Sequence, residues 1–211
     1  MKTKRALGRW LANLALCLML VGTVACASRR SATWSEPFDA PGDWHLSSDA
    51  AANVAVEDGV LRVHVIEVGQ VAWASAGRTY DDFRLTVEAT QVSGPADNEY
   101  GVLVRMQDDQ HFYAFSVSGD GYVRAARYDG TSWIILGPDW SASAAVNQGA
   151  AMNVLEVEVT GGTFIFRVND TQVLQVEDAT YTRGDIGLYA GSFSEGDVVI
   201  TFDNLEVQPL F

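Results

Sequence analysis

The chain has 211 residues, of which 14 are basic and 27 acidic, and its formal net charge is −13. Phosphate backbones repel so acidic a surface, which argues against a nucleic-acid partner. Only two cysteines occur, too few for a disulfide-rich scaffold.

The first 25 residues have three parts. The stretch "MKTKRALGR" is basic, "WLANLALCLMLVG" is apolar, and residues 23–25 are small. This order is typical of a secretory signal peptide, and the apolar run is too short for a comfortable membrane span. We therefore predict a signal peptide at residues 1–25.

The residue after this segment is Cys26. The sequence "TVAC" resembles a bacterial lipobox, whose cysteine is acylated and becomes the mature N-terminus, although Thr23 stands where that pattern usually has Leu. The resemblance implies a lipidated Cys26 with a short tether at residues 26–33, and a lipid-anchored protein of the bacterial cell envelope, outside the cytoplasm. The alternative is a plain secreted protein with an incidental cysteine.

Loss of the signal peptide changes the thiol content and the charge. Cys17 leaves with it, and an acylated Cys26 has no free thiol, so a disulfide, a thiolate zinc site and a cysteine nucleophile are excluded. Four of the 14 basic residues leave too, so 10 basic residues face 27 acidic ones and the formal charge becomes −17. Anionic lipid headgroups repel such a body, so we expect membrane contact through the lipid anchor only.

From Trp34 onward, short runs alternate apolar and polar residues, as in residues 61–67, 83–92 and 153–159. Alternation with a period of two residues predicts strands with one buried face and one solvent-exposed face. Turn-forming residues separate the runs: Asp58-Gly59, Gly119-Asp120-Gly121, Asp129-Gly130, Gly161-Gly162 and Asn169-Asp170. The longest irregular stretch is 137–153. We predict an all-β fold at residues 34–211, a single domain with a two-sheet antiparallel β-sandwich of the jelly-roll type.

Four segments carry a family resemblance. They are the run "YGVLVRMQDDQHFYAFSVSGDGYVRAARYDGTSWIIL" and the later runs "VNDTQVLQVED", "DIGLYAG" and "VITFDNLEV". Residues 35–209 resemble the concanavalin A-like, laminin-G-type jelly rolls, in particular the branch called 3-keto-disaccharide hydrolase or domain of unknown function 1080. The resemblance implies the fold and leaves the activity open, because this superfamily contains lectins, glycanases and adhesion modules.

Glycanases of this fold carry their acids on one strand, in a motif similar to E-x-D-x-E. The nearest match is "LEVEV", with Glu156 and Glu158 two residues apart on one strand face, a spacing that brings two carboxyl groups near the distance a retaining mechanism needs. The third acid is missing and no aromatic residue flanks the pair. We interpret the two glutamates as a solvated strand face, with catalysis as the alternative. None of the three histidines has the context of a triad or the spacing of a metal site.

Residues 100–140 combine aromatic side chains with arginines, as sugar-binding grooves do. The predicted ligand-binding residues are Tyr100, Arg105, Tyr113, Arg124 and Trp133. Arg105 lies in an apolar run, where a charge needs an acidic partner or a ligand. The alternative places Tyr113 and Trp133 in the core and makes Arg105 half of an ion pair.

Related jelly rolls often hold a structural Ca²⁺ between the first and last strands, so the resemblance also implies possible ligands at Glu36, Asp39 and Asp203. Alternatively, these carboxylates cap strand ends.

We expect a surface-anchored lipoprotein with a carbohydrate-binding or cell-surface interaction domain that does not catalyse a reaction. The alternatives are a glycoside-acting hydrolase of the 3-keto-disaccharide hydrolase type and a structural envelope protein.

Overall fold

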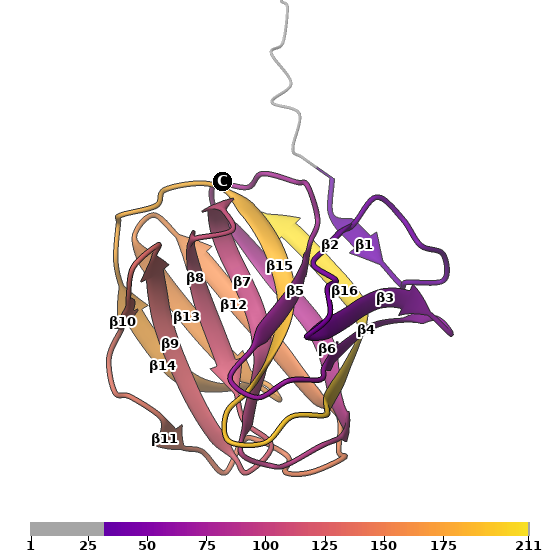
Figure 1. Ribbon diagram of the computed structural model, residues 1–211. Coiled ribbons are helices and arrows are strands. Elements are labelled where there is room, and N and C mark those ends of the chain that lie inside the picture. Colours follow the sequence, from indigo (N-terminus) through magenta and orange to yellow (C-terminus); the bar gives the residue numbers. More distant parts are fainter. Residues whose placement is uncertain (1–31, 211) are drawn as a thin grey trace, which may run out of the picture.

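Residues 32–210, which the computed structural model describes, fold into two antiparallel sheets packed face to face (Figure 1). This confirms the prediction of an all-β jelly-roll sandwich. The predicted signal peptide, Cys26 and most of the tether lie outside the described residues. Within residues 32–210, no helix is long and apolar enough to cross a bilayer.

The first sheet, sheet I, runs in the spatial order β14, β13, β12, β6, β16, β4 and β3, and β1 pairs with β16. Its strands, in chain order, are β1 (Trp34–Glu36), β3 (Ala52–Glu57), β4 (Val60–Val65), β6 (Phe83–Ser93), β12 (Asn153–Thr160), β13 (Thr163–Val168), β14 (Thr171–Glu177) and β16 (Val198–Pro209).

The second sheet, sheet II, runs in the spatial order β10, β9, β8, β7, β15, β5 and β2, and β11 pairs with β9. Its strands, in chain order, are β2 (His45–Leu46), β5 (Val71–Ser75), β7 (Asn98–Asp108), β8 (His111–Val117), β9 (Tyr122–Asp129), β10 (Trp133–Ile135), β11 (Ser141–Ala142) and β15 (Asp185–Ser192).

Two of the predicted turns show why the neighbouring strands form hairpins. The turn between β13 and β14 has φ of 50° at Asn169 and 63° at Asp170, and the turn between β3 and β4 has φ of 52° at Asp58 and 78° at Gly59. Two successive positive φ angles match the twist of an antiparallel pair. Asn, Asp and Gly tolerate this conformation, so the turn prediction is confirmed at both sites.

An aromatic layer holds the two sheets together. Tyr113 of β8 lies 4.6 Å from Phe164 of β13, between ring centroids, and Phe115 lies 5.5 Å from the same ring. All three side chains are fully buried. They come from the alternating positions that face inward, so strand periodicity directly produces this core.

The outer face of sheet II departs from simple alternation, because it is buried as well. Leu103, Phe112, Ala114 and Tyr189 form a second apolar cluster there, separate from the core between the sheets. Partly buried side chains of β5 and β9 pack against it. The candidate site lies on this covered outer face.

Candidate functional site

Four polar side chains from four neighbouring strands meet on the outer face of sheet II. They are Glu99 of β7, Ser116 of β8, Arg124 of β9 and Tyr189 of β15. Arg124 Nη2 donates to Glu99 Oε2 at 2.9 Å. The Tyr189 hydroxyl donates to the same carboxylate oxygen at 3.3 Å and lies 2.6 Å from Ser116 Oγ. The register of the sheet thus assembles one connected polar cluster.

Burial governs the electrostatics of this cluster. The Glu99 side chain is 5% exposed and the Arg124 side chain 12%. Desolvation raises the pKa of the Glu99 carboxyl above its ordinary value, and the charge of Arg124 and the hydrogen bond from Tyr189 offset part of that rise. Desolvation and the nearby Glu99 carboxylate also raise the pKa of Tyr189 well above its usual value. Charges here interact strongly because little water screens them.

A cleft of about 580 Å³ opens above the ion pair. Its lining residues are Gly69, Val71, Glu99, Arg124, Trp133, Ser192, Phe193 and Ser194. Gly191 of β15 pairs with Glu99 across the sheet, and a Cβ atom at Gly191 would lie 2.9 Å from Glu99 Cγ. A side chain at this position would therefore displace the carboxylate, so the glycine makes room for it.

Aromatic rings hold the guanidinium of Arg124 in place. Its Cζ lies 4.7 Å from the ring centroid of Trp140 and 5.6 Å from that of Trp133. Trp133 in turn packs against Tyr128, 5.0 Å away between centroids, and is 37% exposed. The cleft therefore combines a fixed cation with a partly open aromatic surface.

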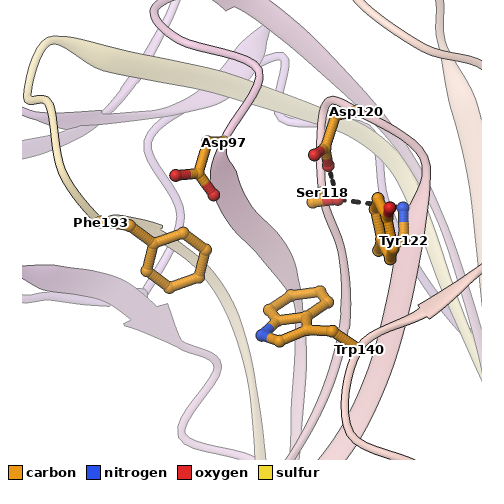
Figure 2. Close-up of a pocket in the computed structure, with 6 residues that line it drawn as sticks. All are labelled: Asp97, Ser118, Asp120, Tyr122, Trp140 and Phe193. Carbon is orange, nitrogen blue, oxygen red and sulfur yellow. Dashed lines mark hydrogen bonds between the residues drawn. The ribbon is translucent and has the colours of Figure 1, made fainter.

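A smaller pocket of about 220 Å³ adjoins the cleft (Figure 2). Asp97, Ser118, Asp120, Tyr122, Trp140 and Phe193 line it. Phe193 borders both spaces, and its ring meets Trp140 edge-on at 5.9 Å. The two spaces are thus neighbours along one aromatic surface.

The family model described as the 3-keto-alpha-glucoside-1,2-lyase-like domain matches residues 32–208. The chain belongs to this family. The match covers nearly all of the described residues and includes every strand that contributes to the cleft. A search of curated proteins finds no match of significant similarity.

Solved structures share the fold of this 3-keto-alpha-glucoside-1,2-lyase-like domain. A carbohydrate-binding module CBM66 from Bacillus subtilis superposes with a TM-score of 0.65 at 15% identity, over 80% of this chain and 96% of that one. A prokaryotic β-1,3-1,4-glucanase (lichenase) derived from a mouse hindgut metagenome gives a TM-score of 0.61 at 10% identity, over 84% and 99%. At such identities the similarity extends to the fold alone.

The structure brings two of the five predicted ligand-binding residues together. Arg124 and Trp133 both line the cleft of this lyase-like domain. Tyr100 and Tyr113 face the core between the sheets and are fully buried. The Tyr100 hydroxyl accepts a hydrogen bond from Asn153, and that of Tyr113 donates to Asp178 at 2.7 Å.

Arg105 also lies away from the cleft. It has φ of 51° at an irregularity in the pairing of β7 with β8, so it leaves the face that it would share with Leu103 by alternation. Its side chain is 1% exposed and forms an ion pair with Asp82 at 3.2 Å. It also donates to the backbone carbonyls of Asp81 and Tyr181, each at 3.1 Å. This is the alternative that the sequence left open.

Glu156 and Glu158 point outward from β12 in sheet I, away from the cleft. Arg167 Nη1 contacts Glu156 at 2.5 Å, and Arg84 Nη2 donates to Glu158 at 2.6 Å. The hydrogen bond from Arg84 lowers the pKa of Glu158. A carboxyl that is held ionised in this way is poorly suited to donate a proton to a leaving group.

The possible calcium ligands lie near β1 and β16. Glu36 Oε1 accepts a hydrogen bond from the amide of Phe38, and Asp203 Oδ1 accepts one from the amide of Asn204. In the part of the chain that the structure describes, no group of three or more His, Cys, Asp or Glu side chains is placed to hold a metal ion. Calcium binding at Glu36, Asp39 and Asp203 stays a prediction.

The sequence did not single out Asp97, Glu99, Tyr189 and Phe193 of the site, and it indicated Asp120 only as part of a predicted turn. Glu99 carries one usable signal, since it directly precedes the apolar run "YGVLV" in a strand that is buried on both faces. A carboxylate in that position needs a partner. Phe193 follows β15 in a loop, where no periodicity exists to indicate its direction.

Proposed function

We propose that this domain binds a carbohydrate in the cleft above Glu99 and Arg124 without catalysing a reaction. The observation that carries the proposal is the position of the Arg124 guanidinium, which is largely buried and packs against Trp140 and Trp133, beside the partly exposed ring of Trp133. Sugars present an apolar ring face together with hydroxyl groups. Trp133 offers a flat surface to the ring face, Arg124 donates to hydroxyl oxygens, and Glu99 accepts from hydroxyl groups.

Two further observations support a glycan ligand. The family's name refers to a glucoside-cleaving activity, and one of the structural neighbours is itself a carbohydrate-binding module.

A second candidate function is cleavage of a glycoside in the same cleft, as the family's name suggests. The raised pKa of Glu99 favours this candidate, because a carboxyl whose pKa lies closer to neutrality is a better proton donor and acceptor. Arg124 opposes it, since the cation stabilises the ionised carboxylate. For this reason we place binding first.

A glycan array followed by calorimetric titration tests the proposal, using the chain from residue 28 onward, which includes the whole sandwich. We expect saturable binding of a defined glycan, weakened about tenfold or more in Trp133→Ala. Glu156→Gln, on the outer face of sheet I, is the control and should bind normally. Mass spectrometry of the bound glycan separates the two candidates, because an unchanged mass excludes cleavage. A blank array with folded protein would contradict both candidate functions and favour a structural role in the envelope.

We expect the cleft to face away from the predicted anchor. The described chain begins beside β1 at the top of Figure 1, whereas the loop between β15 and β16, which contributes Phe193 and Ser194 to the cleft, lies at the opposite end. Lipidation at Cys26 would therefore direct the cleft away from the membrane.

We expect radiolabelled palmitate to label the full chain in a bacterial host and not its Cys26→Ser variant, which should appear in the soluble fraction. Equal labelling of both proteins would contradict the anchor.

A further inference from the structure

The pocket beside the cleft differs from it in charge. In the cleft, the carboxylate of Glu99 is neutralised by Arg124. In the pocket, Asp97 and Asp120 are both exposed to solvent, and neither forms an ion pair within residues 32–210. Asp120 accepts a hydrogen bond from the Ser118 hydroxyl, and the Asp97 carboxylate is directed toward the space that Phe193 and Trp140 border (Figure 2). The pocket therefore holds two exposed carboxylates without an ion-pair partner among the described residues, and the nearest described guanidinium at this aromatic wall, that of Arg124, is already paired with Glu99.

Aromatic rings accompany these charges. Trp140 and Phe193 meet edge-on at 5.9 Å, and Tyr122, which is 38% exposed, lines the same pocket. Carboxylates pair with ammonium groups by charge-assisted hydrogen bonds, and aromatic faces attract cations. The combination of both features in one pocket suits a cationic group attached to an apolar ring.

The pocket and the cleft suit one ligand. Phe193 borders both, and Trp140 contacts Phe193 as well as the guanidinium of Arg124, whose Cζ lies 4.7 Å from its ring centroid. A chain of sugar units that lies over Arg124 therefore reaches Asp97 and Asp120 along a continuous aromatic wall. A uronate at that position would be repelled by the two carboxylates.

We infer that the pocket is a second subsite, which binds the protonated amine of an amino sugar next to the unit held over Arg124. This inference rests on the proposed carbohydrate binding and specifies its ligand class, a glycan with free, unacetylated amino groups. Calcium is the competing occupant, because it takes oxygen ligands and the pocket offers those of two carboxylates, a serine and a tyrosine. The rings of Trp140 and Phe193, which line the same pocket, favour the ammonium group instead.

The test compares three β-1,4-linked tetrasaccharides by calorimetry at about pH 6, where a sugar amine is protonated: the glucosamine tetramer, its fully N-acetylated form and cellotetraose. We expect the glucosamine tetramer to bind about tenfold tighter than the other two, with an advantage that falls as salt rises. Asp97→Asn combined with Asp120→Asn should lower the affinity for the glucosamine tetramer to that of the uncharged tetramers and so remove this preference. Asp109→Asn, an exposed acid in the turn between β7 and β8, should keep the preference and so controls for the loss of a negative charge elsewhere on the surface.

The other possible results contradict either the amine subsite or the proposed function. Equal affinity for all three tetramers, or the same preference in the Asp97 and Asp120 double variant, overturns the amine subsite and leaves carbohydrate binding intact. Tight binding of an amine-free glycan on the array, without binding of the glucosamine tetramer, would likewise overturn the amine subsite and leave carbohydrate binding intact. A preference that disappears in chelator assigns the pocket to a metal ion instead. Failure to bind any glycan overturns the proposed function itself.

Discussion

Arg124→Met is expected to destabilise the fold by about 3 kcal/mol at neutral pH. The Arg124 and Glu99 side chains are 12% and 5% exposed, so the substitution leaves a carboxylate in a poorly solvated position. Methionine keeps much of the aliphatic volume between Trp133 and Trp140, so the loss comes mainly from the unpaired charge. Denaturant unfolding, followed by tryptophan fluorescence, measures the change.

The pH dependence of this loss identifies its cause. Burial already raises the pKa of Glu99 above its unfolded value, and removal of Arg124 takes away the largest opposing effect. A carboxyl whose folded pKa is raised favours the fold below its unfolded pKa of about 4.3 and loses that contribution as pH rises through the folded pKa. The deficit of Arg124→Met should therefore be largest at about pH 7.5 and shrink toward pH 5.

A double variant provides the matched control. Glu99→Gln removes the stranded charge, so Glu99→Gln combined with Arg124→Met should recover about 1–3 kcal/mol relative to Arg124→Met alone. Arg62→Met breaks a more exposed ion pair with Glu57 on sheet I and should cost less than about 1 kcal/mol. A deficit in Arg124→Met that is independent of pH would attribute the loss to packing rather than to the ion pair.

The sequence predicted the sheets well because strand alternation records local burial. Residues 83–92 and 153–159 alternate as expected, and their apolar side chains face the core. Strands β4, β6, β12 and β13 of sheet I follow this local rule, and the turn residues mark where strands reverse. No long-range information is needed for that level of description.

The site was less predictable because it depends on contacts between distant segments. Glu99 and Arg124 are 25 residues apart, and Glu99 and Tyr189 are 90 apart. Only the strand order β9, β8, β7, β15 places them together. Alternation also fails on sheet II, where both faces are buried, so the pattern does not indicate which aromatic residues face the cleft.

Arg105 shows how one residue with an irregular backbone conformation makes a prediction from strand alternation wrong. By alternation it shares a face with Leu103, whereas its φ of 51° turns it toward Asp82 and the end of the core, with the guanidinium 5.3 Å from the ring of Phe164. A positive φ is uncommon outside Gly, Asn and Asp, and the residues next to Arg105 do not indicate it in the sequence. The chemical expectation that a charge in an apolar run requires a partner nevertheless applies here.

Arg105→Met should destabilise the domain by about 3 kcal/mol without altering glycan affinity of the folded protein. The substitution removes the donors to the carbonyls of Asp81 and Tyr181 and the ion pair with Asp82. Lysine cannot reproduce this branched set of donors, so Arg105→Lys should recover only part of the loss.

Arg183→Met is the control for Arg105→Met, because Arg183 contacts Asp81 from an exposed position, with 66% of its side chain open to solvent. Surface pairs of this kind contribute little, so its midpoint of denaturation should remain near that of the unmodified protein. Calorimetric titration on each folded variant then separates the two roles of arginine in this chain. Unchanged affinity in Arg105→Met with weakened affinity in Arg124→Met makes one guanidinium structural and the other part of the binding surface, whereas equal loss of affinity in both would place Arg105 in the site after all.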